Sequence, residues 1–173
     1  DKSNWRLNKK EAPVGGMTAT GIHLTDLSTL LFGPARDVRV SCEKLASNIP
    51  QGDTMSAHIR FKNGGTAYIS ATLATPFISR FALFGTKGWI DIRDKAHVES
   101  PAGWVVTSAT TGSPITVEEI PAAEPVKDNL VSFARAIRGK EAYRITGPEL
   151  VNNIAILEAI IASAAQDGAV VSL

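Results

Sequence analysis

The spacing of apolar residues changes twice along this chain, and this change constrains the fold more than any other feature. From Ile22 to Phe32 the apolar residues fall at helical spacing, and Gly33-Pro34 ends the pattern. Between Val38 and Ile120 the period becomes two, and toward the C-terminus it returns to the helical value. We therefore predict one helix, then a run of strands, then two helices.

The strands of the middle region are marked by alternation of apolar and polar residues and by the turn residues between them. Glycine and proline separate these runs, which favours hairpin connections and a mostly antiparallel sheet. Alternation covers residues 54–61 and 67–73, and shorter apolar runs follow at 80–84, 89–92, 104–107 and 115–120.

The C-terminal region predicts two amphipathic helices. The first ends at Gly139, and the second runs from Leu150 toward Gly168. Thr146 and Glu149 have the spacing of a capping box at the start of the second helix. This order of elements predicts the α+β class, with an open, mostly antiparallel or mixed β-sheet and helices packed on one face.

The hairpin between the first two alternating runs predicts the register of the sheet. Asn63-Gly64-Gly65 favours a three-residue loop, because a two-residue loop would mix the apolar and polar faces. With these three residues in the loop, Ile59 faces Ile69 and His58 faces Ser70.

The polar face of these two strands predicts an assembly surface. It carries Ser, Thr, Tyr and His side chains, and Arg60 is its only charged residue. A sheet face open to water usually carries more charge. We therefore predict a homodimer or homotetramer that uses this face for oligomerisation.

Length and charge limit the classes of protein that this chain can belong to. A chain of 173 residues is long enough for one core and short for two ordinary domains, so we expect a single domain over residues 1–173. The formal net charge of +1 gives no reason to expect nucleic acid or a membrane surface as a partner.

Two further features bear on the compartment. Cys42 is the only cysteine and cannot form an internal disulfide, so we expect a reducing, cytoplasmic location. Polar residues interrupt the longest apolar stretches, 150–165 and 169–173, and we expect no membrane span. The chain opens on a polar run instead of a methionine, so we expect an upstream segment to be missing.

The chain lacks the sequence pattern of a dinucleotide site. Gly15-Gly16 and Gly64-Gly65 do not have GxGxxG spacing, and no alternation of strand and helix surrounds them. We expect no cofactor-binding residues in this chain and no Ser/His/Asp hydrolase site. His23 and Asp26 could share a helix face, but no third ligand follows at a suitable spacing, so we expect no metal site.

The segment from Gly15 to Asp26, GGMTATGIHLTD, resembles the motif that opens the C-terminal domain of the Gfo/Idh/MocA family of NAD(P)-dependent oxidoreductases. Five further matches lie in the family's order and extend the resemblance over nearly the whole chain. They are Trp5-Arg6 and residues 61–65, 84–88, 133–139 and 158–168.

The resemblance implies a function for the intact protein: hydride transfer between NAD or NADP and a small-molecule substrate, which would be a sugar, inositol or related polyol. An upstream Rossmann domain, absent from this chain, would hold the cofactor. His23 would be the catalytic histidine, Thr20 would line the substrate pocket, and Asp26 would orient the helix or the histidine. Trp5 would fill core or interface as large aromatic residues usually do, but with Arg6 it lies close enough in sequence to this site to form a pocket wall. Members of the family commonly pair through the open sheet, which agrees with the predicted oligomer.

One residue departs from the family pattern and leaves an alternative open. Dehydrogenases of the family usually carry an aspartate four residues before the histidine, and Ala19 stands there in this chain. An alanine can neither accept a hydroxyl proton nor hold the imidazole. The alternative is a noncatalytic ligand-binding or scaffold protein on the same fold.

Overall fold

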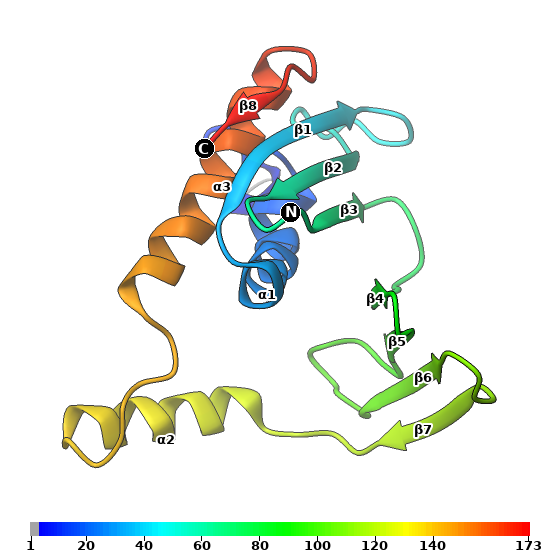
Figure 1. Cartoon of the computed structure of the whole chain (residues 1–173). Coiled ribbons are helices and arrows are strands. Elements are labelled where there is room, and N and C mark those ends of the chain that lie inside the picture. The colour runs from blue at the N-terminus through cyan, green and yellow to red at the C-terminus, as the bar shows by residue number, and fades with distance from the viewer. Residues whose placement is uncertain (1–3) are drawn as a thin grey trace. The chain divides into compact units, whose positions relative to one another are not determined.

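The computed structural model describes residues 4–173, except for the side chain of Ala19 (Figure 1). The chain divides into two compact units, Asp1–Thr75 with Ile145–Leu173, and Pro76–Arg144. The predicted α+β class is confirmed. The strands that we expected in one sheet form two four-stranded sheets, one in each unit, and every pairing in both sheets is antiparallel.

The first unit holds a sheet of order β3-β2-β1-β8. Its strands are β1 (Ala35–Glu43), β2 (Thr54–Phe61), β3 (Thr66–Thr72) and β8 (Val171–Ser172). Its helices are α1 (Ile22–Phe32), which has the predicted bounds, and α3 (Gly147–Ala165), with the short turns η1 (Trp5–Leu7) and η2 (Met17–Gly21).

The capping box predicted at the start of α3 is confirmed. The amide of Thr146 donates to Oε2 of Glu149 at 2.7 Å, and the amide of Glu149 donates to Oγ1 of Thr146 at 3.4 Å. These two bonds satisfy amides that an uncapped helix would leave free.

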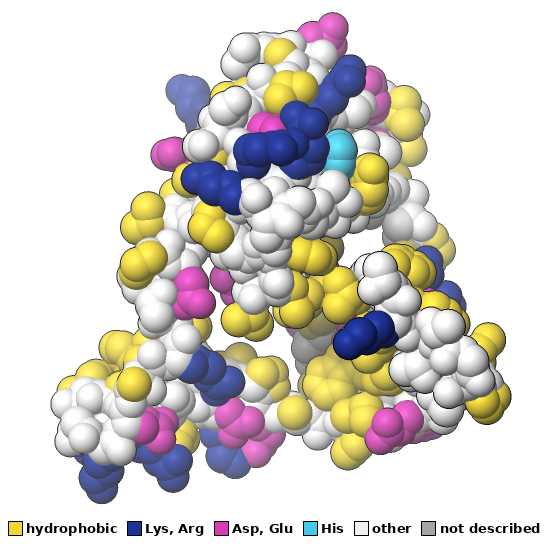
Figure 2. Space-filling model, viewed as in Figure 1, with side chains coloured by type: hydrophobic (Ala, Val, Ile, Leu, Met, Phe, Trp, Pro, Cys, Tyr) yellow, Lys and Arg dark blue, Asp and Glu magenta, His cyan; other side chains and the backbone are white. Residues whose placement is uncertain are grey.

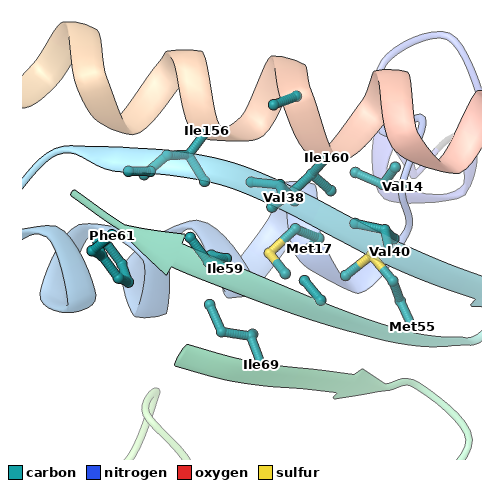
Figure 3. Close-up of a cluster of buried hydrophobic side chains, with 13 residues drawn as sticks. Val14, Met17, Val38, Val40, Met55, Ile59, Phe61, Ile69, Ile156 and Ile160 are labelled. Carbon is teal, nitrogen blue, oxygen red and sulfur yellow. The ribbon is translucent and has the colours of Figure 1, made fainter. Parts of the chain in front are cut away.

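The core of the first unit lies between one face of the sheet and the helices, as Figure 3 shows. Val38 and Ile59 point from the sheet toward Ile156 and Ile160 of α3, and Met17 of η2 completes the layer. All five side chains are fully buried or nearly so. Burying an aliphatic side chain of this size contributes about 1.5 to 3 kcal/mol, so this layer fixes η2 and α3 on the sheet. Helices therefore cover one face of this sheet, as predicted.

Among the described residues, α3 is the one helix long and apolar enough to cross a membrane by length and composition. Composition therefore does not exclude a span here, contrary to our expectation. The helix lies against β1, and Ile156, Ile160 and Ser163 are inaccessible to solvent. Packing against the sheet accounts for the apolar residues on its buried side, Ile156, Ala159 and Ile160.

The β2–β3 hairpin has the predicted loop length but a different position. Its three loop residues are Lys62-Asn63-Gly64, closed by Phe61 and Gly65, so our prediction of Asn63-Gly64-Gly65 was wrong by one residue. Ile59 consequently faces Ala67, and His58 faces Tyr68. The physical reason is Gly64, whose φ of +92° supplies the left-handed residue that ends such a loop. The two faces remain unmixed, as predicted.

The second unit contains a meander of four strands and one helix. Asp91 is nearly buried in this sheet and accepts hydrogen bonds from Arg80 at 2.6 Å and Arg93 at 3.1 Å. These guanidinium groups hold the pKa of Asp91 below its usual range, with Arg80 the larger cause. The elements are β4 (Arg80–Gly85), β5 (Gly88–Asp94), β6 (Trp104–Thr110), β7 (Thr116–Ile120) and α2 (Pro125–Ile137), and they confirm the strands and the helix predicted here.

Candidate active site

The candidate site is built on the junction between η2 and α1. η2 is a π-helical turn, and the amide of Ile22 bonds to the carbonyl oxygens of both Met17 and Thr20 where the turn passes into α1. A Cβ at Gly21 would collide with the sulfur of Met17, so a larger residue there would force this fully buried side chain to move. π-helical turns inside helices occur frequently at functional sites.

Three of the residues proposed from the sequence lie on this junction at intervals of three. Thr20, His23 and Asp26 therefore share one side of the η2–α1 segment, and all three are exposed. The hydroxyl of Thr20 donates to the carbonyl oxygen of Gly16 at 2.8 Å, which leaves its lone pairs free to accept from a ligand. Within residues 4–173 no hydrogen bond joins Asp26 to His23, and the role of Asp26 in orienting the helix or the histidine stays a prediction.

The side of α1 that faces α3 is polar. The buried residues of α1 are Thr25, Ser28 and Thr29. Asn153 of α3 accepts a hydrogen bond from Thr25 at 2.5 Å, and Asn152 donates to Thr29 at 3.3 Å. From the sequence, Asn152 and Asn153 appear only among the polar residues that interrupt an apolar stretch. Two adjacent asparagines within an apolar helix were the signal that could have marked this contact.

Trp5 and Arg6 lie on a different support. The guanidinium of Arg6 stacks over the ring of Trp5 at 4.7 Å, and both side chains are exposed. Gln51, which is 4% exposed, donates from Nε2 to the carbonyl oxygen of Arg6 at 2.5 Å and so fixes η1 to the loop before β2. In the described part of the chain no hydrogen bond or ring contact links these residues to His23, so their place in a pocket wall remains a prediction.

The loop that carries Gln51 is organised by a buried carboxylate. Asp53 is 1% exposed and accepts hydrogen bonds from the amides of Ala46 at 2.9 Å, Leu45 at 3.1 Å and Ser47 at 2.6 Å. The hydrogen bond from the amide of Ala46, followed by that from Leu45, holds the pKa of Asp53 far below its usual range. Sequence patterns alone did not single out Asp53 or Gln51.

The described residues do not fit a dinucleotide or a metal ion. Both sheets are antiparallel throughout, so residues 4–173 contain no strand, glycine turn and helix of the kind that cradles a pyrophosphate. Nor does this part of the chain bring together three or more His, Cys, Asp or Glu side chains in a way that could hold a metal. The chemistry open to the η2–α1 surface is hydrogen bonding and proton exchange with a polar ligand.

The uncovered face of the β1–β3 sheet, called here the open face, is a second feature of the first unit. It contains a shallow hollow of about 450 Å³ lined by residues that include Ser56, His58, Tyr68 and Ser70. The rings of His58 and Tyr68 stack with centroids 4.6 Å apart. Figure 2 shows Lys and Arg side chains and a histidine gathered over these strands.

The open face carries more charge than the two strands alone predicted. β1 adds Arg39 and Glu43, which also line the hollow. Arg60 is not an isolated charge, because its Nε donates to Asp37 at 2.6 Å. This contact, together with Arg36, keeps the pKa of Asp37 below its usual range.

Comparisons with known proteins agree with the family resemblance found in the sequence. Residues 1–91 match the model of the GFO/IDH/MocA C-terminal domain. The chain is 28% identical to D-xylose 1-dehydrogenase (NADP(+)) 2 of Haloferax volcanii over 119 residues, which cover 69% of this chain and 36% of the relative.

Solved structures share the fold at low identity. The aldose-aldose oxidoreductase from Caulobacter crescentus superposes with a TM-score of 0.80 at 23% identity, over 100% of this chain and 52% of its own. The inositol dehydrogenase homolog from Azotobacter vinelandii superposes with a TM-score of 0.77 at 16% identity, over 99% of this chain and 52% of its own. The chain thus spans about half the length of these structures. Because the family model matches more than half of the chain, the chain belongs to the GFO/IDH/MocA family, in which it corresponds to the C-terminal domain.

Proposed function

We propose that this chain is the substrate-binding and assembly domain of an NAD(P)-dependent oxidoreductase that acts on a sugar, inositol or related polyol hydroxyl. The observation that carries the proposal is the exposed row of Thr20, His23 and Asp26 on the η2–α1 segment, in the motif that resembles the family's. The relatives named for xylose, aldose and inositol substrates support the substrate class.

In this proposal residues 1–173 form one C-terminal domain, and a Rossmann domain outside this chain holds NAD or NADP. The cofactor would supply hydride transfer there. The part of this chain is to bind the substrate and to handle its hydroxyl proton: His23 takes or gives that proton, and Thr20 accepts a hydrogen bond from a neighbouring hydroxyl. Histidine suits this role because its ordinary pKa lies near neutrality. The cytoplasmic location remains part of the proposal.

The activity is tested with the intact protein and a panel of aldoses, inositols and linear polyols, each with NAD⁺ and with NADP⁺. We expect reduction of one of the two cofactors, followed at 340 nm, with at least one substrate of the panel. If no member of the panel reduces either cofactor while calorimetry shows that a polyol still binds, the enzymatic proposal fails. This result would support the alternative of a noncatalytic ligand-binding protein.

Ala19 provides a sharper comparison between the two functions. In an oxidoreductase that has lost only a carboxylate beside the histidine, Ala19→Asp would raise the rate of polyol oxidation, because the carboxylate can accept a hydroxyl proton or hold the imidazole. A noncatalytic protein would show no turnover in either form. The substitution Leu30→Asp, at a position of α1 that is 71% exposed, controls for the added charge.

We further propose that two copies of the chain associate through the open face, as a homodimer or within a homotetramer. Tyr68 is 80% exposed on this face, and its ring stacks on that of His58 with centroids 4.6 Å apart. The pairing of Arg60 with Asp37 reduces the charge that an interface would have to desolvate. A second copy would supply partners that a lone sheet lacks.

A further inference from the structure

The first turn of α1 is held by one side chain that reaches across from α3. The hydroxyl of Thr25 lies 2.5 Å from Oδ1 of Asn153 and 2.8 Å from the carbonyl oxygen of Ile22. Nδ2 of Asn153 lies 3.5 Å from the same carbonyl oxygen. The single hydroxyl proton of Thr25 can serve one acceptor at a time, so Asn153 takes it on Oδ1 while its amide group reaches Ile22.

Ile22 is the residue at which the helical pattern changes. Its amide is shared between the carbonyl oxygens of Met17 and Thr20, which is not the bonding of a regular α-helix. Its carbonyl oxygen is the one that Thr25 and Asn153 approach. A backbone that leaves the regular pattern needs such external partners to keep a single conformation.

His23 follows Ile22 directly and its side chain is exposed, so packing within the described residues does not lock its direction. The direction in which the imidazole leaves the helix therefore depends on the backbone at the junction. A group that performs proton transfer loses efficiency when it is displaced by as little as an ångström.

From these contacts we infer that Asn153 is a positioning residue for His23. Its side chain accepts a hydrogen bond from Thr25 and donates to the carbonyl oxygen of Ile22. These two contacts set the orientation that the imidazole of His23 needs before it can transfer a proton. The catalytic consequence rests on the proposed function, whereas the orientation of His23 does not.

Asn152 provides a matched control. It is the neighbouring asparagine on the same helix, it is also partly buried, and its Nδ2 donates to Oγ1 of Thr29 at 3.3 Å, one turn farther along α1. Removing either side chain costs one hydrogen-bonding amide between the same two helices. Only Asn153 contacts the turn that carries His23.

The structural arm of the test uses the imidazole NMR signals of the 173-residue chain, which has only three histidines. We expect Asn153→Ala to shift or broaden the signals of His23 and to leave those of His97 unchanged, and we expect Asn152→Ala to leave both unchanged. Thr25→Val should change the His23 signals as Asn153→Ala does. Thr25→Ser keeps the hydroxyl, so its His23 signals should match those of wild type. If Asn153→Ala does not fold, Asn153→Asp keeps the acceptor for Thr25, replaces the donor to Ile22 by a negatively charged oxygen, and should likewise shift the His23 signals.

The kinetic arm uses the intact oxidoreductase. Asn153→Ala should lower kcat by about ten- to a hundredfold with an unchanged KM for the cofactor, and Asn152→Ala should leave kcat within about twofold. Equal effects of the two variants on His23 signals, or no effect of either, would overturn the inference. If His23→Ala leaves kcat unchanged while Asn153→Ala alone still moves the His23 signals, the positioning role stands and the proposed function falls.

Discussion

Ser163 of α3 is hydrogen-bonded to Val40 of β1 and takes the place of a missing strand. The amide of Val40 donates to Oγ of Ser163 at 3.0 Å, and that hydroxyl donates to the carbonyl oxygen of Ala169 at 2.6 Å. β8 pairs with β1 only at Asp37 and Val38. The amide of Val40, two residues farther along β1, therefore has no backbone partner in β8. One buried hydroxyl therefore joins the helix, the strand and the turn that leads into β8.

Ser163→Ala should lower the free energy of unfolding by about 1 to 3 kcal/mol, because it leaves a buried amide and a carbonyl group unpaired. Urea unfolding followed by circular dichroism measures the change. Ser172→Ala removes an exposed hydroxyl of β8 and is expected to have an effect of about 0.5 kcal/mol or less. Equal midpoints for the two variants would show that the hydroxyl of Ser163 does not stabilise this junction.

Asp53 should make the stability of the first unit fall at acid pH. Its folded pKa is lowered by the loop amides, whereas an unfolded aspartate titrates at about 3.9. The stabilisation is therefore complete above about pH 4 and is lost as the pH falls toward the lower folded value.

Asp53→Asn should be less stable than wild type at pH 7, and should lose less stability between pH 5 and pH 3, since one of the carboxylates that titrate there is gone. Urea midpoints at these pH values provide the measurement. An acid dependence as steep in the variant as in wild type would contradict the role of the carboxylate.

The parts of the fold that the sequence could predict are those with local signals. The bounds of α1 follow from helical spacing and from the glycine and proline that end it, and the start of α3 follows from Thr146 and Glu149. The alternation of apolar and polar residues located the strands, because a strand with one buried and one exposed face carries the two residue types in turn.

The remaining features depend on contacts between distant residues. Alternation does not tell which strands pair, so the division into two sheets after Thr72 was not predicted. The hairpin register depended on which glycine takes the left-handed conformation, and the sequence offered both Gly64 and Gly65. In the candidate site, the motif located His23, but Asn153 lies 130 residues farther along the chain and only the fold brings it to Ile22.

Ser70→Glu should weaken the proposed association through the open face. A carboxylate placed in a desolvated contact without a partner costs about 1 to 3 kcal/mol per copy. Light scattering on micromolar samples measures the mass. Ser113→Glu adds the same charge at an exposed turn of the second unit and serves as the control. A wild-type chain that shows only an 18.4 kDa species, or an oligomer indifferent to Ser70→Glu, would contradict the assembly proposal.

The central claim is that His23 transfers a proton in the reaction of the intact oxidoreductase. The most direct measurement is kcat for polyol oxidation in His23→Ala, with His97→Ala as the control, since His97 is an exposed histidine of the second unit. We predict a loss of about two to four powers of ten for His23→Ala and a rate within about twofold of wild type for His97→Ala. A near wild-type rate for His23→Ala, or an equal loss in both variants, would contradict the account.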